Sequence, residues 1–204
     1  MKDNKYVMLG LGLIVIVILF FVFTYKNQKI GNTINNKSTD EIVRNVLSIS
    51  SYKAIAEVTI QSNKTTNHYT VMQEYIHGQG WKQTMIEPEE LAGVITSYHD
   101  GTITLENTNL GLQKLYESYE DYHYMNQNAL WLSTFISGFT GESTITENEE
   151  EIIVENRQNH SPYLGNQILH ISKKTKLPTE MKIQDNNKNT TIYIKYKEIQ
   201  LNKK

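Results

Sequence analysis

The chain has 204 residues, a formal net charge of −2, a sequence pI near 6.3 and no cysteine. This charge balance gives no reason to expect a nucleic-acid partner. The lack of cysteine excludes disulfides, thiolate metal sites and cysteine nucleophiles. After the first thirty or so residues, about 170 remain, which suits one domain with a sizeable core.

An apolar run begins near the N-terminus. Residues 7–23 carry no charge, and Tyr6 and Tyr25 bracket them. About 17–19 apolar residues just span a hydrocarbon core of about 30 Å, and tyrosines suit the membrane interface. No small-residue cleavage pattern comes after Phe23, so an uncleaved anchor is favoured over a cleaved signal peptide.

This interpretation divides the chain into four parts. We expect a cytoplasmic tail at residues 1–5, a transmembrane anchor at 6–25, a linker at 26–37 and a β-rich domain at 38–202. Lysines flank both ends of the apolar run, so the positive-inside rule is nearly balanced. The domain is expected outside the cytoplasm, as part of the spore or cell envelope, because a short N-terminal tail and one anchor usually export the domain attached to them.

The domain begins with a predicted helix. Ser38, followed three residues later by Glu41, forms a capping box. Apolar residues at 42, 43, 46 and 47 then mark one face of a short helix. We expect this helix to cover a sheet.

Alternation with a period of two comes after the helix and predicts half-buried strands. The predicted strands are, in chain order, 52–61, 69–76, 81–86, 94–98, 103–105, 152–155, 167–172, 180–184 and 191–199. Asp100 and Gly101 separate two of them as a hairpin turn, since this dipeptide tolerates the positive φ that such turns need.

A second helical stretch is expected within residues 122–139, where Leu130, Phe135 and Ile136 would cover the sheet. Trp81 and Trp131 are assigned to the core. About seven to nine antiparallel strands with one or two helices give a mainly β (α+β) fold. Its predicted form is a curved antiparallel sheet, or half-barrel, with helices on its concave face. A plain β-sandwich is the alternative.

Motifs that would carry catalysis are missing from the sequence. The six histidines do not form H-x-x-x-H or H-E-x-x-H, and there is no nucleophile elbow, phosphate loop or S-x-x-K. Glu147–Glu151 is rich in carboxylates, but such a run is usually a solvated loop. We therefore predict no catalytic residue, no cofactor, no metal site and no enzymatic activity.

A tyrosine-rich segment is the first feature that indicates binding. Tyr116, Tyr119, Tyr122 and Tyr124 are interleaved with acidic residues. Tyrosine offers a large amphipathic contact at low entropic cost, so these four are the candidate partner-binding residues. The alternative is that some of them simply pack on the sheet.

Charge segregation is the second such feature. Residues 115–156 contain nine Asp or Glu and no Lys or Arg, whereas residues 173–204 contain nine lysines and three acids. This pattern predicts a dipolar domain that could steer a charged partner, and a plain solvated surface is the alternative.

The C-terminal strands carry a resemblance. The stretch from Lys174 to Asp185 contains Pro178 and Ile183 and is similar to the pattern K-x-x-x-x-P-x-x-x-x-I-x-D, and a strand at 192–196 comes after a turn. With the preceding capped helix, the Gly-x-x-Trp-Lys strand and the Asp-Gly hairpin, this layout resembles the LolA/LolB class of lipoprotein carriers. The resemblance spans about residues 38–202 and implies a curved antiparallel sheet.

Within that class, the anchored architecture is most similar to the spore germination protein GerS and its relatives. The resemblance implies a non-enzymatic partner that binds and activates the cortex amidase CwlD, a zinc-dependent N-acetylmuramoyl-L-alanine amidase. Lipoproteins of this group carry a lipobox cysteine, which this chain lacks, so its anchor would be the N-terminal helix itself. The alternative function is a lipid or lipoprotein carrier or sensor that holds an acyl chain in the concavity of the sheet.

Overall fold

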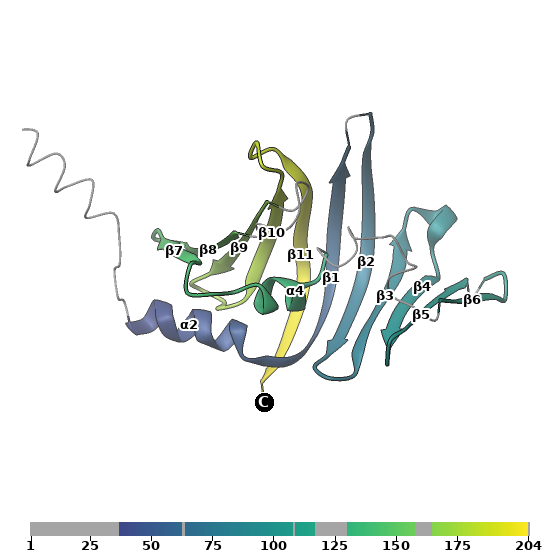
Figure 1. Cartoon of the computed structure of the whole chain (residues 1–204), viewed down its shortest axis with the longest axis horizontal. Helices are drawn as coiled ribbons and strands as arrows, with labels where there is room; N and C mark the ends of the chain where they lie inside the picture. The colour runs from purple at the N-terminus through teal and green to yellow at the C-terminus, as the bar shows by residue number, and fades with distance from the viewer. Residues whose placement is uncertain (1–36, 63, 108, 117–129, 158–164, 204) are drawn as a thin grey trace, which may run out of the picture. The chain divides into compact units, whose positions relative to one another are not determined.

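A single antiparallel sheet organises the chain. The computed structural model describes residues 37–62, 64–107, 109–116, 130–157 and 165–203. Within them, eleven strands hydrogen-bond in the order β6-β5-β4-β3-β2-β1-β11-β10-β9-β8-β7. The sheet is open and strongly curled (Figure 1).

The strands vary in length from four to fourteen residues. Their bounds are β1 Ile49–Gln61, β2 Thr66–Ile76, β3 Gly80–Glu87, β4 Val94–His99, β5 Thr102–Asn107, β6 Leu112–Tyr116, β7 Thr144–Glu147, β8 Glu151–Arg157, β9 Asn166–Ser172, β10 Pro178–Gln184 and β11 Thr190–Lys203.

Two meanders join at the centre of the sheet. Strands β1 to β6 follow one another in space as in sequence, and so do β7 to β11. The long strands β1 and β11 pair antiparallel along most of their length, from Ile49 opposite Lys203 to Ile60 opposite Ile192. Pairing between the two ends of the described chain therefore unites both halves around one core.

Among the described residues, three short helices accompany the sheet: α2 Lys37–Leu47, the 3₁₀ helix η1 Glu89–Leu91 and α4 Leu132–Ser137. Ile42, Val43 and Val46 of α2 are buried, as the apolar spacing predicts. Phe135 of α4 is also fully buried. Both α2 and α4 share one hydrophobic cluster with residues from a single face of the sheet, which we call the inner face.

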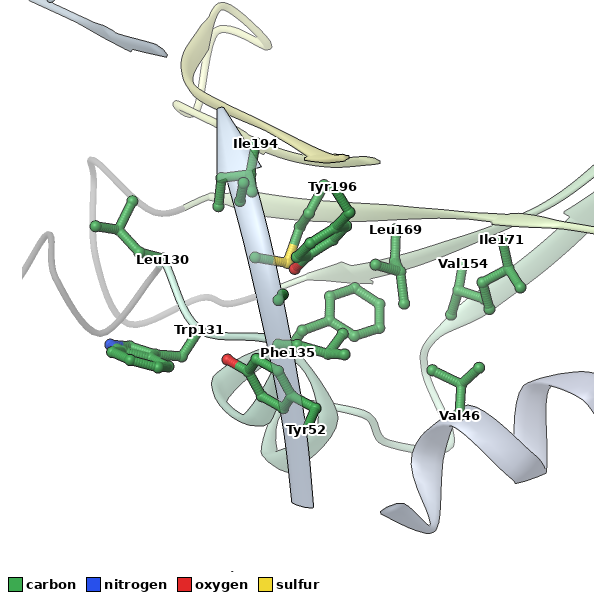
Figure 2. Packing of buried hydrophobic residues seen from close by; sticks show 14 of the residues in the cluster. Val46, Tyr52, Leu130, Trp131, Phe135, Val154, Leu169, Ile171, Ile194 and Tyr196 are labelled. Carbon is green, nitrogen blue, oxygen red and sulfur yellow. The ribbon is translucent and has the colours of Figure 1, made fainter. Parts of the chain in front are cut away.

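The inner face is lined by alternate residues of the central strands. Ala54, Ala56 and Val58 of β1 leave room for the bulky side chains packed above them. Figure 2 shows Phe135 among these side chains, with Tyr52 and Trp131 on one side of it and Leu169 on the other. Burying such large aromatic and aliphatic groups contributes about 1.5–3 kcal/mol each.

The structure confirms the mainly β class and one curled antiparallel sheet. The count of seven to nine strands was wrong, because β6 and β7 were missed. The alternative of a plain β-sandwich is wrong, since all eleven strands belong to one sheet. Within the predicted helical stretch 122–139, the described part holds a helix only at Leu132–Ser137.

The predicted anchor at residues 6–25 lies outside the described residues. Among the described ones, no helix is both long and apolar enough to cross a membrane. The anchor and the envelope location therefore stay predictions.

Candidate functional site

The inner face is filled by the chain's own residues where the described segment 130–137 crosses it. Trp131 is 1% exposed, and Leu132 and Phe135 are fully buried. The indole of Trp131 lies 4.7 Å from that of Trp81 and 6.4 Å from the ring of Tyr52, measured between centroids. Trp131 is thus a core residue, as predicted, and Trp81 packs against the same cluster.

Two buried amide side chains hold this segment against the sheet. Nε2 of Gln73 on β2 donates to the carbonyl of Leu130 at 3.2 Å, and Nδ2 of Asn156 on β8 donates to the carbonyl of Phe135 at 2.8 Å. Both amides are fully buried. Gln73 also donates to Oε1 of Gln83 at 3.2 Å. The segment is therefore fixed by directional bonds from both halves of the sheet as well as by packing.

The hollows on the described part of the surface are open to solvent. One of about 390 Å³ lies between Leu47, Ile49, Tyr75 and Ile136, with Lys203 also in its lining. Another, of about 440 Å³, has a mainly polar lining that includes Glu57, His68 and Glu87. The first combines apolar side chains with three serines, a histidine and a lysine, and the second offers carboxylates and an imidazole.

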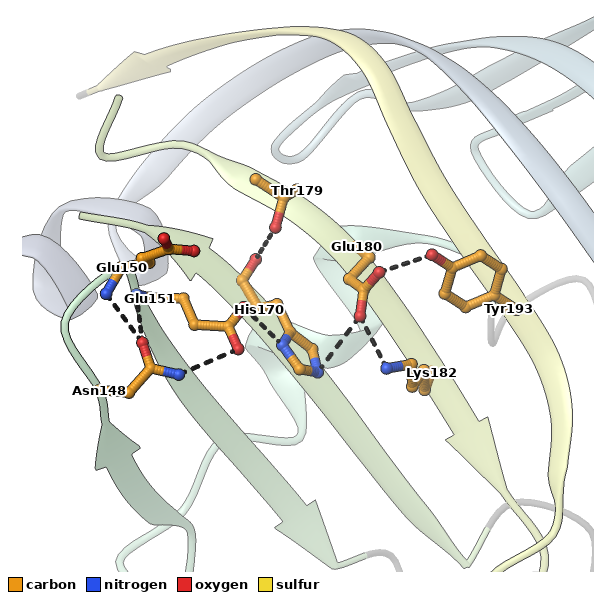
Figure 3. Close-up of polar contacts among 8 residues, drawn as sticks. All are labelled: Asn148, Glu150, Glu151, His170, Thr179, Glu180, Lys182 and Tyr193. Carbon is orange, nitrogen blue, oxygen red and sulfur yellow. Dashed lines mark hydrogen bonds and ion pairs between the residues drawn. The ribbon is translucent and has the colours of Figure 1, made fainter. Parts of the chain in front are cut away.

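A ladder of charged and polar groups crosses the outer face, the side opposite the core (Figure 3). The ring of His170 on β9 lies between two carboxylates: its Nδ1 is 3.0 Å from Glu151 Oε2 and its Nε2 is 3.5 Å from Glu180 Oε1. Glu180 also pairs with Lys182 at 2.7 Å and accepts a hydrogen bond from the Tyr193 hydroxyl at 2.5 Å.

These contacts shift the acidity of two groups in the ladder. Partial burial raises the pKa of the Glu180 carboxyl, but hydrogen bonds from Lys182 and Tyr193 and the charges of Lys182 and His170 outweigh it, so the net pKa is lowered. Burial, then the hydrogen bond to Glu180, raises the pKa of Tyr193 to about 12. The ladder joins β8, β9, β10 and β11 and works as a cross-strand support.

The remaining described histidines make local contacts. His68 meets the Thr59 hydroxyl at 3.0 Å, His77 meets that of Tyr75 at 3.3 Å, and His99 lies 3.2 Å from Asp100. Within the ranges that the structure describes, no group of three or more His, Cys, Asp or Glu could hold a metal.

Charges that are segregated in the sequence meet in the fold. Lys173, which begins the β9–β10 turn, pairs with Glu147 of β7 at 2.7 Å and donates from Nζ to the carbonyl of Asn148 at 2.5 Å. Glu147 also accepts a hydrogen bond from Thr39 of α2. The predicted solvated acidic loop is therefore partly wrong: Glu147 and Glu151 lie in strands, where Glu147 is ion-paired with Lys173 and Glu151 is in hydrogen-bond contact with His170.

Of the four candidate tyrosines, the described residues include Tyr116. Tyr116 is the last residue of β6, opposite Ile103 of β5. Tyr119, Tyr122 and Tyr124 lie outside the described residues. The partner-binding role of all four therefore stays a prediction.

Exposed leucines mark the same end of the sheet. Leu110 and Leu112, on either side of Gly111 in the β5–β6 hairpin, are 67% and 63% exposed, and Leu91 of η1 is 39% exposed. Sequence reasoning missed them. The sequence Leu110-Gly111-Leu112 was an available signal, because it places two leucines at a turn. Whether these leucines are buried depends on the strand order, which the sequence did not reveal.

Comparison with known families then identifies the group. Residues 10–204 match the family model described as sporulation protein YdcC-like. The chain belongs to this family. A search of curated proteins found no match.

Solved structures of similar fold share little sequence with this YdcC-like chain. One is an uncharacterised conserved protein from Thermus thermophilus, with 10% identity, a TM-score of 0.50, and coverage of 82% of this chain and 89% of that one. A chain from the complex of the CwlD amidase with the GerS lipoprotein of Clostridioides difficile has 18% identity, a TM-score of 0.49, and coverage of 82% and 95%.

A LolA superfamily protein from Nitrosomonas europaea has 9% identity, a TM-score of 0.40, and coverage of 81% of this chain and 94% of that one. Both groups that the strand pattern resembles are therefore among the solved structures found. At these identities the likeness is one of fold.

Proposed function

We propose that this chain is a non-enzymatic, membrane-anchored protein of sporulation that binds and activates a cortex-modifying N-acetylmuramoyl-L-alanine amidase of the CwlD type. The observation that carries the proposal is membership of a sporulation family over residues 10–204, nearly the whole chain. The GerS–CwlD complex names the class of partner to test.

The arrangement of the described residues supports a binding role. Trp131, Leu132 and Phe135 occupy the inner face, and the polar groups of the outer face are engaged with one another across strands. The exposed leucines at the β6 end, by contrast, offer apolar area to a partner. A protein that acts through its surface fits this arrangement better than one that acts on a substrate inside it.

Affinity purification of the tagged full-length chain from sporulating cells, solubilised in detergent, tests the proposal. Mass spectrometry of the co-purifying proteins is expected to recover a cell-wall amidase. The matched control is the same purification from cells in which the tag is carried by an unrelated single-pass protein. Recovery of no amidase above that control would contradict the proposal.

A carrier or sensor of lipid is the second candidate. The hollow beside Leu47, Ile49 and Ile136 favours it, because apolar walls next to Lys203 could receive an acyl chain with an acidic head. Native mass spectrometry of the detergent-exchanged full chain distinguishes the two. A stoichiometric co-purified lipid would favour the carrier, and a lipid-free chain that retains the amidase would favour the binding partner.

A further inference from the structure

The β5–β6 hairpin presents its leucines on an ordered support. The side-chain Oδ1 of Asn107 accepts hydrogen bonds from the main-chain N–H of Asn109 and of Leu110, both at 3.1 Å. Gly111 adopts φ +63°, which glycine allows without strain. These two hydrogen bonds brace the described part of the turn, and a preorganised loop loses less entropy on binding.

A second loop is tied to this hairpin. Nδ2 of Asn109 donates to the carbonyl of Ala92 at 2.8 Å, and Ala92 comes directly after η1. Antiparallel order places the β3–β4 connection and the β5–β6 turn at the same end of their strands. Leu91 and Leu110 thus lie on two loops that a hydrogen bond joins, and Leu112 begins β6 beside them. We call these three residues the leucine tip.

Acidic residues outnumber basic ones at the end of the strands that carries the leucine tip. Between residues 86 and 114, this end of the strands carries Glu87, Glu89, Glu90 and Glu106, whereas Lys114 is the single Lys or Arg of that range. Glu89 and Glu90 directly precede Leu91 in η1 and are exposed. An apolar centre with an acidic rim is complementary to an apolar groove with a basic rim.

The charge of the acidic residues around the leucine tip decides among three kinds of occupant. Bilayers of the envelope carry anionic lipids, which repel a tip surrounded by carboxylates. A second copy of the chain would bring the same acidic rim against itself, and like charges across an interface are unfavourable. A protein groove lined by apolar residues and edged by Lys or Arg meets neither penalty.

We propose that the leucine tip is the docking element for the protein partner and inserts Leu110 and Leu112 into an apolar groove edged by basic residues. This inference rests on the proposed function, because it names the surface with which the chain would hold its amidase.

The test measures the affinity of the full-length chain in detergent for the purified amidase, using fluorescence anisotropy. The variant Leu110→Ser/Leu112→Ser removes the apolar tip. Ile76→Ser is the matched control, because Ile76 is 48% exposed and ends β2 at the β2–β3 turn, away from the leucine tip. Circular dichroism and thermal unfolding confirm that each variant is folded, and Leu110→Ser alone replaces the double variant if that one is not.

The inference predicts that Kd rises at least about tenfold for the double variant and less than about twofold for Ile76→Ser, because a few central, desolvated side chains dominate the binding free energy of an interface. Glu89→Lys/Glu90→Lys is expected to slow association and to reverse its dependence on salt. Equal affinity of wild type and double variant would overturn the inference while leaving the proposed function standing.

Two further results of these experiments would overturn the inference. If the wild-type chain does not bind the amidase, the proposed function fails and this inference fails with it. If the double variant keeps its amidase affinity but loses self-association on gel filtration, or loses binding to vesicles of anionic lipid, the tip serves a second copy or a membrane and the inference is overturned.

Discussion

The side-chain amide of Asn156 donates to the main-chain carbonyl of Phe135 at 2.8 Å, across 21 positions of sequence. Both residues are fully buried. This bond fixes the position of α4 on the C-terminal half of the sheet, just as Gln73 fixes Leu130 on the N-terminal half. These two hydrogen bonds therefore fix the segment 130–137 over the inner face. The sequence predicted this segment only as part of a longer helical stretch.

Replacing Asn156 by alanine should loosen this closure. We expect Asn156→Ala to lower the free energy of unfolding by about 1–3 kcal/mol, because the variant loses a buried hydrogen bond and leaves a small void. Urea unfolding followed by tryptophan fluorescence measures the change, and Trp131 should report it directly. The matched control Asn202→Ala, at an exposed position of β11, should change stability by less than about 0.5 kcal/mol.

The lowered pKa of Glu180 predicts that the stability of the folded chain falls at acidic pH. Its pKa in the folded chain is lowered because Lys182, Tyr193 and His170 together outweigh the effect of its partial burial. A lowered folded-state pKa gives stability that is present above the unfolded-state pKa, about 4.3, and is lost as the pH falls through the folded-state value. The difference in Tm between wild type and Glu180→Gln should therefore be largest near pH 7 and shrink below about pH 4.

The control for that series is Glu57→Gln. Glu57 forms a more exposed pair with Lys197 at 2.8 Å, and surface pairs contribute little. Its variant should shift Tm less than Glu180→Gln near pH 7, where the contribution of the Glu180 carboxylate is largest. A Glu180→Gln difference that stays constant from pH 7 to below pH 4 would show that the carboxylate is not stabilised as described.

The raised pKa of Tyr193 predicts that stability is lost as the pH rises into the alkaline range. Its pKa is raised from 10.0 to about 12, first by burial and then by Glu180. A raised folded-state pKa gives stability that is present below the unfolded-state value and is lost as the pH rises through the folded-state value. Wild type should therefore lose more stability than Tyr193→Phe between pH 10 and about pH 12. Identical alkaline unfolding curves for the two proteins would refute this assignment.

Gly80 at the start of β3 is expected to tolerate no side chain. Its φ is +120°, and an added Cβ would lie 1.9 Å from the main-chain oxygen of Tyr98 on β4. Strain and overpacking each cost about 1–3 kcal/mol, so Gly80→Ala should destabilise the chain strongly or prevent β3–β4 pairing. Gly78→Ala is the matched control: its φ is +76° and the added Cβ meets nothing within 4 Å. Thermal unfolding should show a clearly smaller loss for this control, about 1–2 kcal/mol.

Much of the sheet could be predicted from local pattern. Alternation along β1, β8 and β9 reflects one buried face, and Asp100 and Gly101 do adopt the positive φ values of +45° and +81° that the turn chemistry implied. β7 has only four residues, and its Thr144 and Thr146 are exposed beside an acidic run, so its alternation carried little apolar signal. β6 likewise exposes Leu112 rather than burying it.

The candidate site was less accessible to sequence reasoning. Exposure of Leu110 and Leu112 results from their place in the last hairpin of an open sheet, and strand order is a long-range property. The meeting of Lys173 with Glu147 likewise joins residues from turns that are distant in sequence. The acidic and the lysine-rich parts of the sequence therefore meet where the β7–β8 and β9–β10 turns lie side by side.

The most direct test of amidase activation is the rate at which the purified amidase cleaves its peptidoglycan substrate as the full-length chain is titrated into the reaction in detergent. We expect a rise in rate that saturates near one chain per amidase and is weakened by Leu110→Ser/Leu112→Ser but not by Ile76→Ser. An amidase rate that is unchanged at every ratio of the two proteins would contradict the proposed function.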